Sequence, residues 1–124
     1  MTQEQLENKV MELLLSAKHE YSSKLYAQYM HSKTTNRTFT GCGFYADLEY
    51  PRELKIDAIH GRIMGVSVHY KRVDNGMGFV LFIKDGGISQ VEGFSYIGAW
   101  NKEDIILIDE NTFSDAGLDV YIKE

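Results

Sequence analysis

The chain has 124 residues, 44% of them hydrophobic, and a formal net charge of -5. This length and apolar content suit one folded domain and exclude a disordered chain. No stretch reaches the roughly 18 apolar residues that a membrane span needs, and the N-terminus lacks the pattern of a signal peptide, so we expect a single cytoplasmic domain over residues 1–124 with no membrane partner.

The N-terminal quarter is predicted to form one long helix. Thr2 and Gln5 fit a capping box, which marks a helix start. Apolar residues then recur at spacings of three and four, giving one stripe made of Leu6, Val10, Leu14, Ala17, Tyr21 and Leu25. We expect the helix to extend to residues 29–30, with a weak point at residues 22–23, and to pack against a sheet. The next stretch, HSKTTNRT, has no periodicity and is predicted to be a loop.

From Thr38 onward the hydrophobic period changes to two, which is typical of half-buried strands. The first strand is predicted to bury one face, with a bulge at one of its glycines, and that face carries Cys42, Phe44, Ala46 and Leu48. Residues 64–71 are predicted to form the next strand, followed by a type I′ hairpin turn at Asn75-Gly76. The stretch GFVLFIK is apolar on both faces and is therefore predicted to lie at the centre of the sheet.

Three further strands are predicted in the C-terminal part. A second hairpin turn, DGG, leads into ISQVEGFSY, and the runs IILI (105–108) and LDVYIK (118–123) follow. A helix followed by about six consecutive strands with tight turns indicates an α+β fold: a long N-terminal helix packed on a mainly antiparallel sheet, with a sandwich-like arrangement as a variant.

Cys42 is the only cysteine. Its phase with apolar neighbours predicts a core residue rather than a nucleophile, because burial disfavours the thiolate that nucleophilic chemistry requires. The four histidines have no paired ligand spacing, so neither a metal site nor a cofactor is expected.

Glu92 lies among aromatic residues in QVEGFSY. A partly buried carboxylate there is a candidate acid or base for a hydrolase, whereas the preferred interpretation is a structural hydrogen bond to a loop or a tyrosine. No catalytic residue is therefore assigned, and the chain is expected not to be an enzyme.

The negative charge is concentrated at the C-terminal end. Residues 103–124 contain seven acids and one lysine, which disfavours nucleic acid as a partner and favours a basic protein. Trp100 precedes this segment and is either a packing residue or an exposed anchor for a partner. The candidate partner-binding residues are Trp100, Asp104, Asp109, Glu110, Asp115 and Asp119. For the acids, the alternative is a solvated terminal face.

Three segments, FTGCGF, GFVLFIKDG and VEGFSY followed by Trp100, resemble a recurring pattern in a family of small bacterial proteins. The pattern runs from Phe39 to Trp100, about half of the chain. The family has no established enzymatic activity, and similar proteins are immunity proteins encoded beside toxins, including those of contact-dependent growth inhibition systems. The resemblance implies a protein that binds and blocks a cognate toxin domain, as a monomer in the complex. Together with the acidic C-terminal end, it favours a basic nuclease domain as the target.

A second hypothesis is a small-molecule-binding or scaffold domain. It places a pocket between the helix and the sheet, lined by Tyr21, Phe44 and Phe82.

Overall fold

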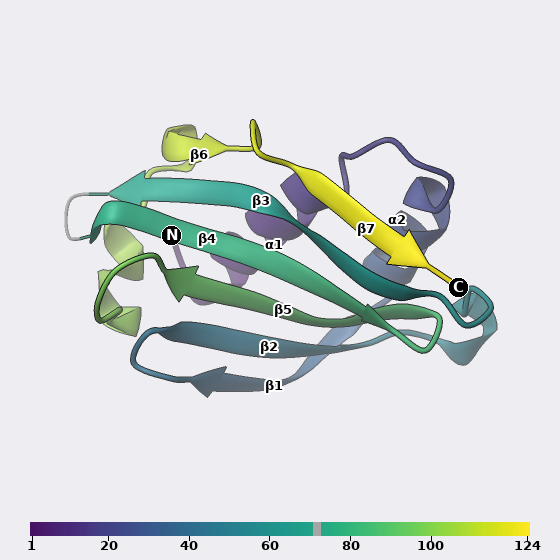
Figure 1. Cartoon of the computed structure of the whole chain (residues 1–124). Helices are drawn as coiled ribbons and strands as arrows, with labels where there is room; N and C mark the ends of the chain where they lie inside the picture. Colours follow the sequence, from purple (N-terminus) through teal and green to yellow (C-terminus); the bar gives the residue numbers. More distant parts are fainter. Residues whose placement is uncertain (71–72) are drawn as a thin grey trace.

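The computed structural model describes residues 1–70 and 73–124, and these form an α+β fold. Its α-helices lie on one face of an antiparallel sheet, whose other face is uncovered (Figure 1). The helices are α1 (Gln3–Leu14) and α2 (Ser22–Met30), with short 3-10 helices η1 (Arg52–Leu54), η2 (Lys102–Leu107) and η3 (Glu110–Thr112). The strands are β1 (Lys33–Phe39), β2 (Gly43–Glu49), β3 (His60–Tyr70), β4 (Val73–Lys84), β5 (Gly87–Ser95), β6 (Phe113–Ser114) and β7 (Asp119–Lys123). No helix in the described ranges is long and apolar enough to cross a membrane.

The predicted single helix is two helices. The capping box is confirmed, since the Gln5 N–H donates to Thr2 Oγ1 (3.1 Å) and the Thr2 N–H donates to Gln5 Oε1 (2.9 Å). However, α1 ends at Leu14, and a new helix begins at Ser22. There the Ser22 hydroxyl accepts the His19 N–H (2.7 Å) and donates to the Ala17 carbonyl (2.8 Å). A serine side chain that bonds to backbone groups in this way competes with helical backbone bonds. The weak point predicted at residues 22–23 is the start of α2, and the break itself spans residues 15–21.

The segment predicted to be a loop is strand β1. It pairs antiparallel with β2, and nearly all of its side chains are exposed. A polar edge strand has no buried face and so leaves no alternation in the sequence.

The strands follow the order β1-β2-β5-β4-β3-β6, with β7 also pairing with β3 beside β6. The central position predicted for GFVLFIK is confirmed. Phe79 and Leu81 of β4 are buried on the helix side, and Val80 is only 5% exposed on the other side, opposite Met64 and Glu92. No second layer covers that other face in the described part of the chain.

The turn predicted at Asn75-Gly76 is wrong, because both residues lie within β4. Tyr70 pairs with Val73, so the β3–β4 connection falls at residues 71–72, outside the described residues. The two-residue loop with positive φ at both positions is instead Asp85-Gly86 (φ 50° and 96°), which joins β4 to β5. Positive φ at both central residues is the requirement of a type I′ turn.

Gln28 of α2 is fully buried and hydrogen-bonds three backbone groups outside its helix. Its Nε2 donates to the carbonyls of Leu54 (2.9 Å) and Gly86 (3.0 Å), and its Oε1 accepts the Ile88 N–H (3.0 Å). A buried amide with these partners stabilises the packing of α2 on the β4–β5 turn, since removing it leaves buried groups without partners.

The C-terminal strand predicted at residues 118–123 is confirmed as β7. It lies along β3 at a place where β3 carries Gly65, with a φ of 104°. A Cβ on Gly65 would lie 1.9 Å from the Gly117 carbonyl oxygen. Only glycine therefore allows the chain before β7 to approach β3 so closely.

Candidate partner-binding site

Large exposed apolar side chains are concentrated on segments at one end of the sheet, where β1 ends and the segment after β5 lies (Figure 1). Of the eight large apolar side chains exposed in the described residues, five belong to β1's last residue or to the segment 96–107. They are Phe39, Tyr96, Ile97, Ile106 and Leu107, which are 41% to 75% exposed. We call this set the apolar end. Clusters of exposed apolar side chains are typical of protein-binding surfaces.

Backbone hydrogen bonds hold the apolar end to the sheet. The Trp100 N–H donates to the Gly41 carbonyl (2.7 Å), and the Ser95 N–H donates to the Cys42 carbonyl (2.8 Å). The β1–β2 loop and the segment after β5 are thereby joined, so the exposed side chains are carried on a fixed backbone.

Trp100 lies beneath this surface and is 4% exposed. Its ring stacks on the Phe39 ring, with 6.2 Å between the ring centroids and an interplanar angle of 11°. The centroid of the Phe44 ring lies 5.7 Å away. The interpretation of Trp100 as an exposed anchor is wrong, and the packing alternative holds. Phe39, which is 41% exposed, is the aromatic residue of this stack that a partner can reach.

The run IILI is not a strand but part of η2 and its end. In a 3-10 helix, residues three apart lie on the same side. Ile105 and Ile108 are accordingly buried, while Ile106 and Leu107 are 75% and 43% exposed. A period of three applied to IILI would have predicted from the sequence that Ile106 and Leu107 are exposed.

The five predicted acids lie on three different segments. Asp104 is half-buried in η2 and lines a shallow hollow beside Trp100 and Phe39. Asp109 and Glu110 are exposed at η3 and border a hollow against α1, where the Asp109 carboxylate also accepts the Asn111 N–H (2.9 Å).

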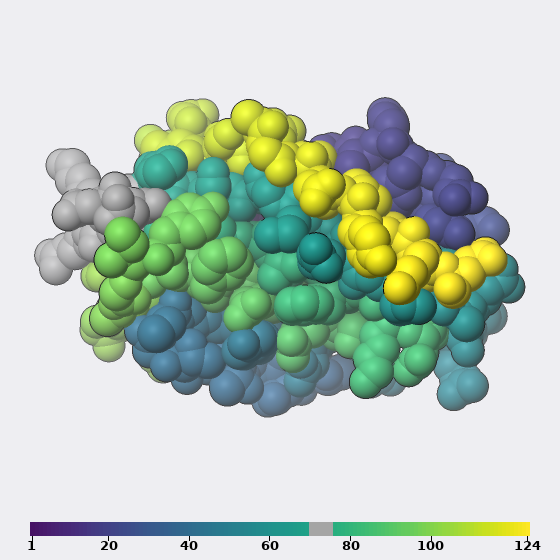
Figure 2. Space-filling view, in the orientation of Figure 1, coloured from purple at the N-terminus to yellow at the C-terminus, as the bar shows by residue number. Residues whose placement is uncertain are grey.

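The two remaining acids belong to another part of the surface. Asp115 lies in the turn between β6 and β7, and Asp119 begins β7 opposite Met64. Figure 2 shows this C-terminal stretch, in yellow, along one edge of the sheet. The five predicted acids therefore do not form one patch. Asp104, Asp109 and Glu110 lie on η2 and at the start of η3, next to the apolar end, whereas Asp115 and Asp119 lie at and before the start of β7.

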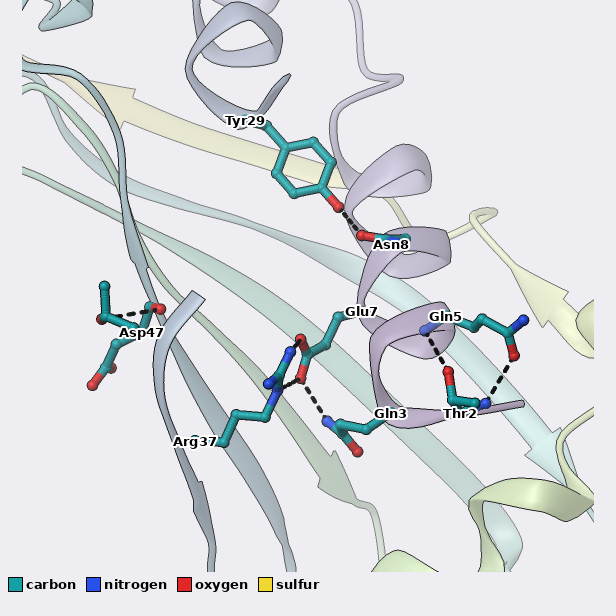
Figure 3. Close-up of polar contacts among 9 residues, drawn as sticks. Thr2, Gln3, Gln5, Glu7, Asn8, Tyr29, Arg37 and Asp47 are labelled. Carbon is teal, nitrogen blue, oxygen red and sulfur yellow. Dashed lines mark hydrogen bonds and ion pairs between the residues drawn. The ribbon is translucent and has the colours of Figure 1, made fainter. Parts of the chain in front are cut away.

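A second concave region lies on the helix side. It is a cleft of about 750 Å³ between α1, the end of α2 and β1, with Leu48 and Val91 at its base. Glu7, which is 5% exposed, binds Arg37 of β1 through two contacts, at 2.8 Å to Nε and 2.7 Å to Nη2. Gln3 Nε2 donates to the same carboxylate at 2.8 Å (Figure 3). This is the only ion pair among the described residues, and it joins residues 30 positions apart that no sequence motif connects.

Tyr29 points into the same cleft, and its hydroxyl donates to Asn8 Oδ1 at 2.5 Å (Figure 3). Burial, followed by the charges of Glu7, Glu4 and Glu12, raises the pKa of Tyr29 to about 12. The negative charges of these α1 carboxylates therefore influence groups in the cleft from the side that α1 forms.

The pocket predicted from Tyr21, Phe44 and Phe82 is wrong in its lining. Phe44 is 1% exposed and belongs to the core, while Phe82 alternates in β4 with core residues and faces the uncovered side. Tyr21 donates to Glu124 at 3.4 Å. None of the three lines the cleft.

Glu92 lies opposite Tyr45 on the uncovered face of the sheet. A side-chain hydrogen bond to Glu92, and then the Glu92 charge, raise the pKa of Tyr45. Glu92 and Tyr45 therefore interact across the β2–β5 pair, and the structural role of Glu92 stays a prediction.

Cys42 is exposed, so its predicted core position is wrong. It lies in the loop between β1 and β2, where its N–H donates to Thr40 Oγ1 (3.2 Å), and β2 begins only at Gly43. Within residues 1–70 and 73–124, no group of three or more His, Cys, Asp or Glu side chains is placed to hold a metal ion.

Comparison of the chain with protein-family models, with curated proteins and with solved structures gives no significant match.

Proposed function

We propose that this protein is an immunity protein that binds and blocks a toxin domain, with a basic nuclease domain as the expected target. The observation that carries the proposal is the apolar end with unpaired acids beside it. An apolar centre with a polar rim is the usual anatomy of a protein–protein interface. The resemblance of Phe39–Trp100 to small bacterial immunity proteins supports the same function.

The acids beside the apolar end are suited to a basic partner. Asp104, Asp109 and Glu110 form no ion pair with a described residue. A nuclease binds phosphates with clustered Lys and Arg, and carboxylates held opposite these residues would occupy the same site. Opposite charges also steer the two proteins together, which raises the association rate.

The apolar contribution is tested with Ile106→Asp. The target is the toxin domain encoded beside the gene for this chain, recovered by co-purification with the wild-type protein. We expect Ile106→Asp to raise the dissociation rate about tenfold or more, because a charge would be buried at the centre of the interface. The matched control is Met30→Asp, at another exposed apolar side chain (58%, against 75% for Ile106) at the end of α2. Equal effects of the two substitutions, with unchanged circular dichroism, would remove the apolar end from the interface.

The charge contribution is tested by reversing Asp109 and Glu110 to Lys. We expect slower association and a weaker salt dependence, measured by binding kinetics at two ionic strengths. Reversal of Asp115 and Asp119 is the matched control and should change association less. If a nuclease assay shows full toxin activity in the presence of excess wild-type protein, blocking as a function is excluded.

A further inference from the structure

The cleft between α1, α2 and β1 has exposed carboxylates along one wall. Glu4 and Glu12 both line it and are exposed, and neither forms an ion pair with a described residue. The Arg37 charge is engaged by Glu7, so Lys33 is the remaining cation in the lining. The cleft wall formed by α1 therefore has carboxylate oxygens free to accept hydrogen bonds from a cation.

The spacing of these carboxylates sets the length of a ligand that could contact both. Glu4 and Glu12 are eight residues apart on α1, which corresponds to about 12 Å along the helix axis at 1.5 Å per residue. Asn8 lies between them and also lines the cleft. A ligand with a positive group at each end must therefore be extended to contact both.

Apolar and aromatic side chains also line the cleft. Leu48 is half-buried, Tyr26 and Met30 of α2 are 50% and 58% exposed, and Met11 and Val91 are buried beneath the surface. Methylene groups pack favourably on such surfaces, and an aromatic ring attracts an ammonium group placed over its face.

The volume of the cleft is consistent with one bound small molecule. About 750 Å³ falls within the range of roughly 300–1,000 Å³ that ligand sites occupy. Burial is the largest cause of the raised pKa of Tyr29, and the charges of Glu7, Glu4 and Glu12 add to it, which agrees with the carboxylates lining this side of the cleft.

We infer that this cleft binds a linear aliphatic polyamine, with terminal ammonium groups at Glu4 and Glu12 and methylene groups on Leu48, Met30 and Tyr26. The site is separate from the apolar end and does not depend on the immunity function. The same alkylammonium chemistry is present in lysine side chains, and the experiment separates the two sources.

The test is titration of the full chain with spermidine, followed by calorimetry and by the NMR signals of residues that line the cleft. We expect Glu4→Gln and Glu12→Gln each to weaken binding about threefold, and the double variant about tenfold, as for exposed charge pairs. Lys33→Gln should strengthen binding, because it removes the opposing charge. Glu20→Gln and Glu103→Gln, exposed acids outside the cleft, are the matched controls and should leave the affinity unchanged.

Comparison of spermidine with a shorter amine, with Mg²⁺ and with a lysine-rich peptide decides whether the cleft binds a polyamine. Putrescine is too short to reach both carboxylates, so it should bind more weakly than spermidine and respond to only one of the two substitutions. Equal weakening by the cleft and control substitutions, or displacement of spermidine by an equal charge of Mg²⁺, would show general attraction to an acidic protein and overturn the inference. Tighter binding of a lysine-rich peptide than of spermidine at the same signals would also overturn it, since the cleft would then be a protein-binding site. None of these measurements uses the toxin domain, so their outcome is independent of the proposed function.

Discussion

At the scale of single residues, Cys42 shows how a period-two pattern can be continued one residue too far. Phe44 and Ala46 are buried as predicted, and Cys42 is in phase with them. The strand, however, begins at Gly43, and the preceding loop turns at Gly41 with a φ of 83°. Alternation has no meaning outside the ladder that imposes it, so the phase of Cys42 says nothing about its burial.

We expect a thiol reagent to label Cys42 in the native protein at a rate close to that in urea, because the side chain is exposed. Cys42→Ala should change the free energy of unfolding by less than about 0.5 kcal/mol, as is usual for surface substitutions. Labelling kinetics with and without denaturant, together with urea unfolding, measure both quantities. Labelling that requires denaturant would contradict the exposed position.

His19 provides a dependence of stability on pH. Its Nδ1 accepts the Tyr21 N–H (3.2 Å), and burial lowers its pKa below 6.5 despite the nearby Glu20. The unfolded chain therefore binds a proton more readily than the folded one. The stabilisation is complete above about pH 6.5 and is lost as the pH falls through the lowered pKa of the folded state.

Urea unfolding at pH 7 and pH 5 tests this effect. The loss of stability between the two pH values should be smaller in His19→Gln than in the wild type. The control is His31→Gln, at an exposed position, which should behave as the wild type does. The same loss in all three proteins would mean that other groups cause the acid sensitivity.

At the scale of elements, four of the six residues in the predicted N-terminal apolar stripe are buried, but they belong to two helices rather than one, and Ala17 and Tyr21 are only partly buried. Leu6, Val10, Leu14 and Leu25 are all fully buried, yet the first three belong to α1 and the last to α2. Burial follows from hydrophobicity, whereas the helix break lies where two serine hydroxyls bond to backbone carbonyls, Ser16 to Leu13 and Ser22 to Ala17. The run IILI is a second example: its residues were recognised as apolar, but their period of three, which is that of a 3-10 helix, was not.

The pairing of β3 with the C-terminal segment gives a prediction for Gly65→Ala. A Cβ at this position would lie 1.9 Å from the Gly117 oxygen and 2.7 Å from the Leu118 Cα, both backbone atoms. Because backbone cannot move aside without separating β7 from β3, we expect a loss of about 3 kcal/mol in the free energy of unfolding. Thermal and urea unfolding measure the loss.

Gly98→Ala is the matched control for this substitution. Gly98 also has a positive φ, 80°, but a Cβ there would meet nothing within 4 Å. The control should cost only the strain of a left-handed residue, about 1 kcal/mol. Similar losses for the two variants would show that β7 adapts to the added methyl group.

At the scale of the whole molecule, the sequence was sufficient for the fold class, the central strand and the C-terminal strand, because each depends on hydrophobic pattern. It did not reveal β1, whose polar residues have no buried face, or the pairing of β2 with β5, which are distant in the chain. The candidate surfaces were the least predictable. Both the apolar end and the cleft are formed by segments that only the folded sheet brings together, and apart from the period of three in IILI no sequence pattern indicated which apolar residues are exposed.

The hydrogen bonds of Gln28 have a consequence for how the molecule opens. One side chain contacts the connector at Leu54, the β4–β5 turn at Gly86 and the start of β5 at Ile88. Separation of any one of these segments from α2 breaks a hydrogen bond of this buried amide. Transient local unfolding of the three segments should therefore occur as one cooperative event, so that their protected amide hydrogens exchange with solvent at a shared free energy of opening.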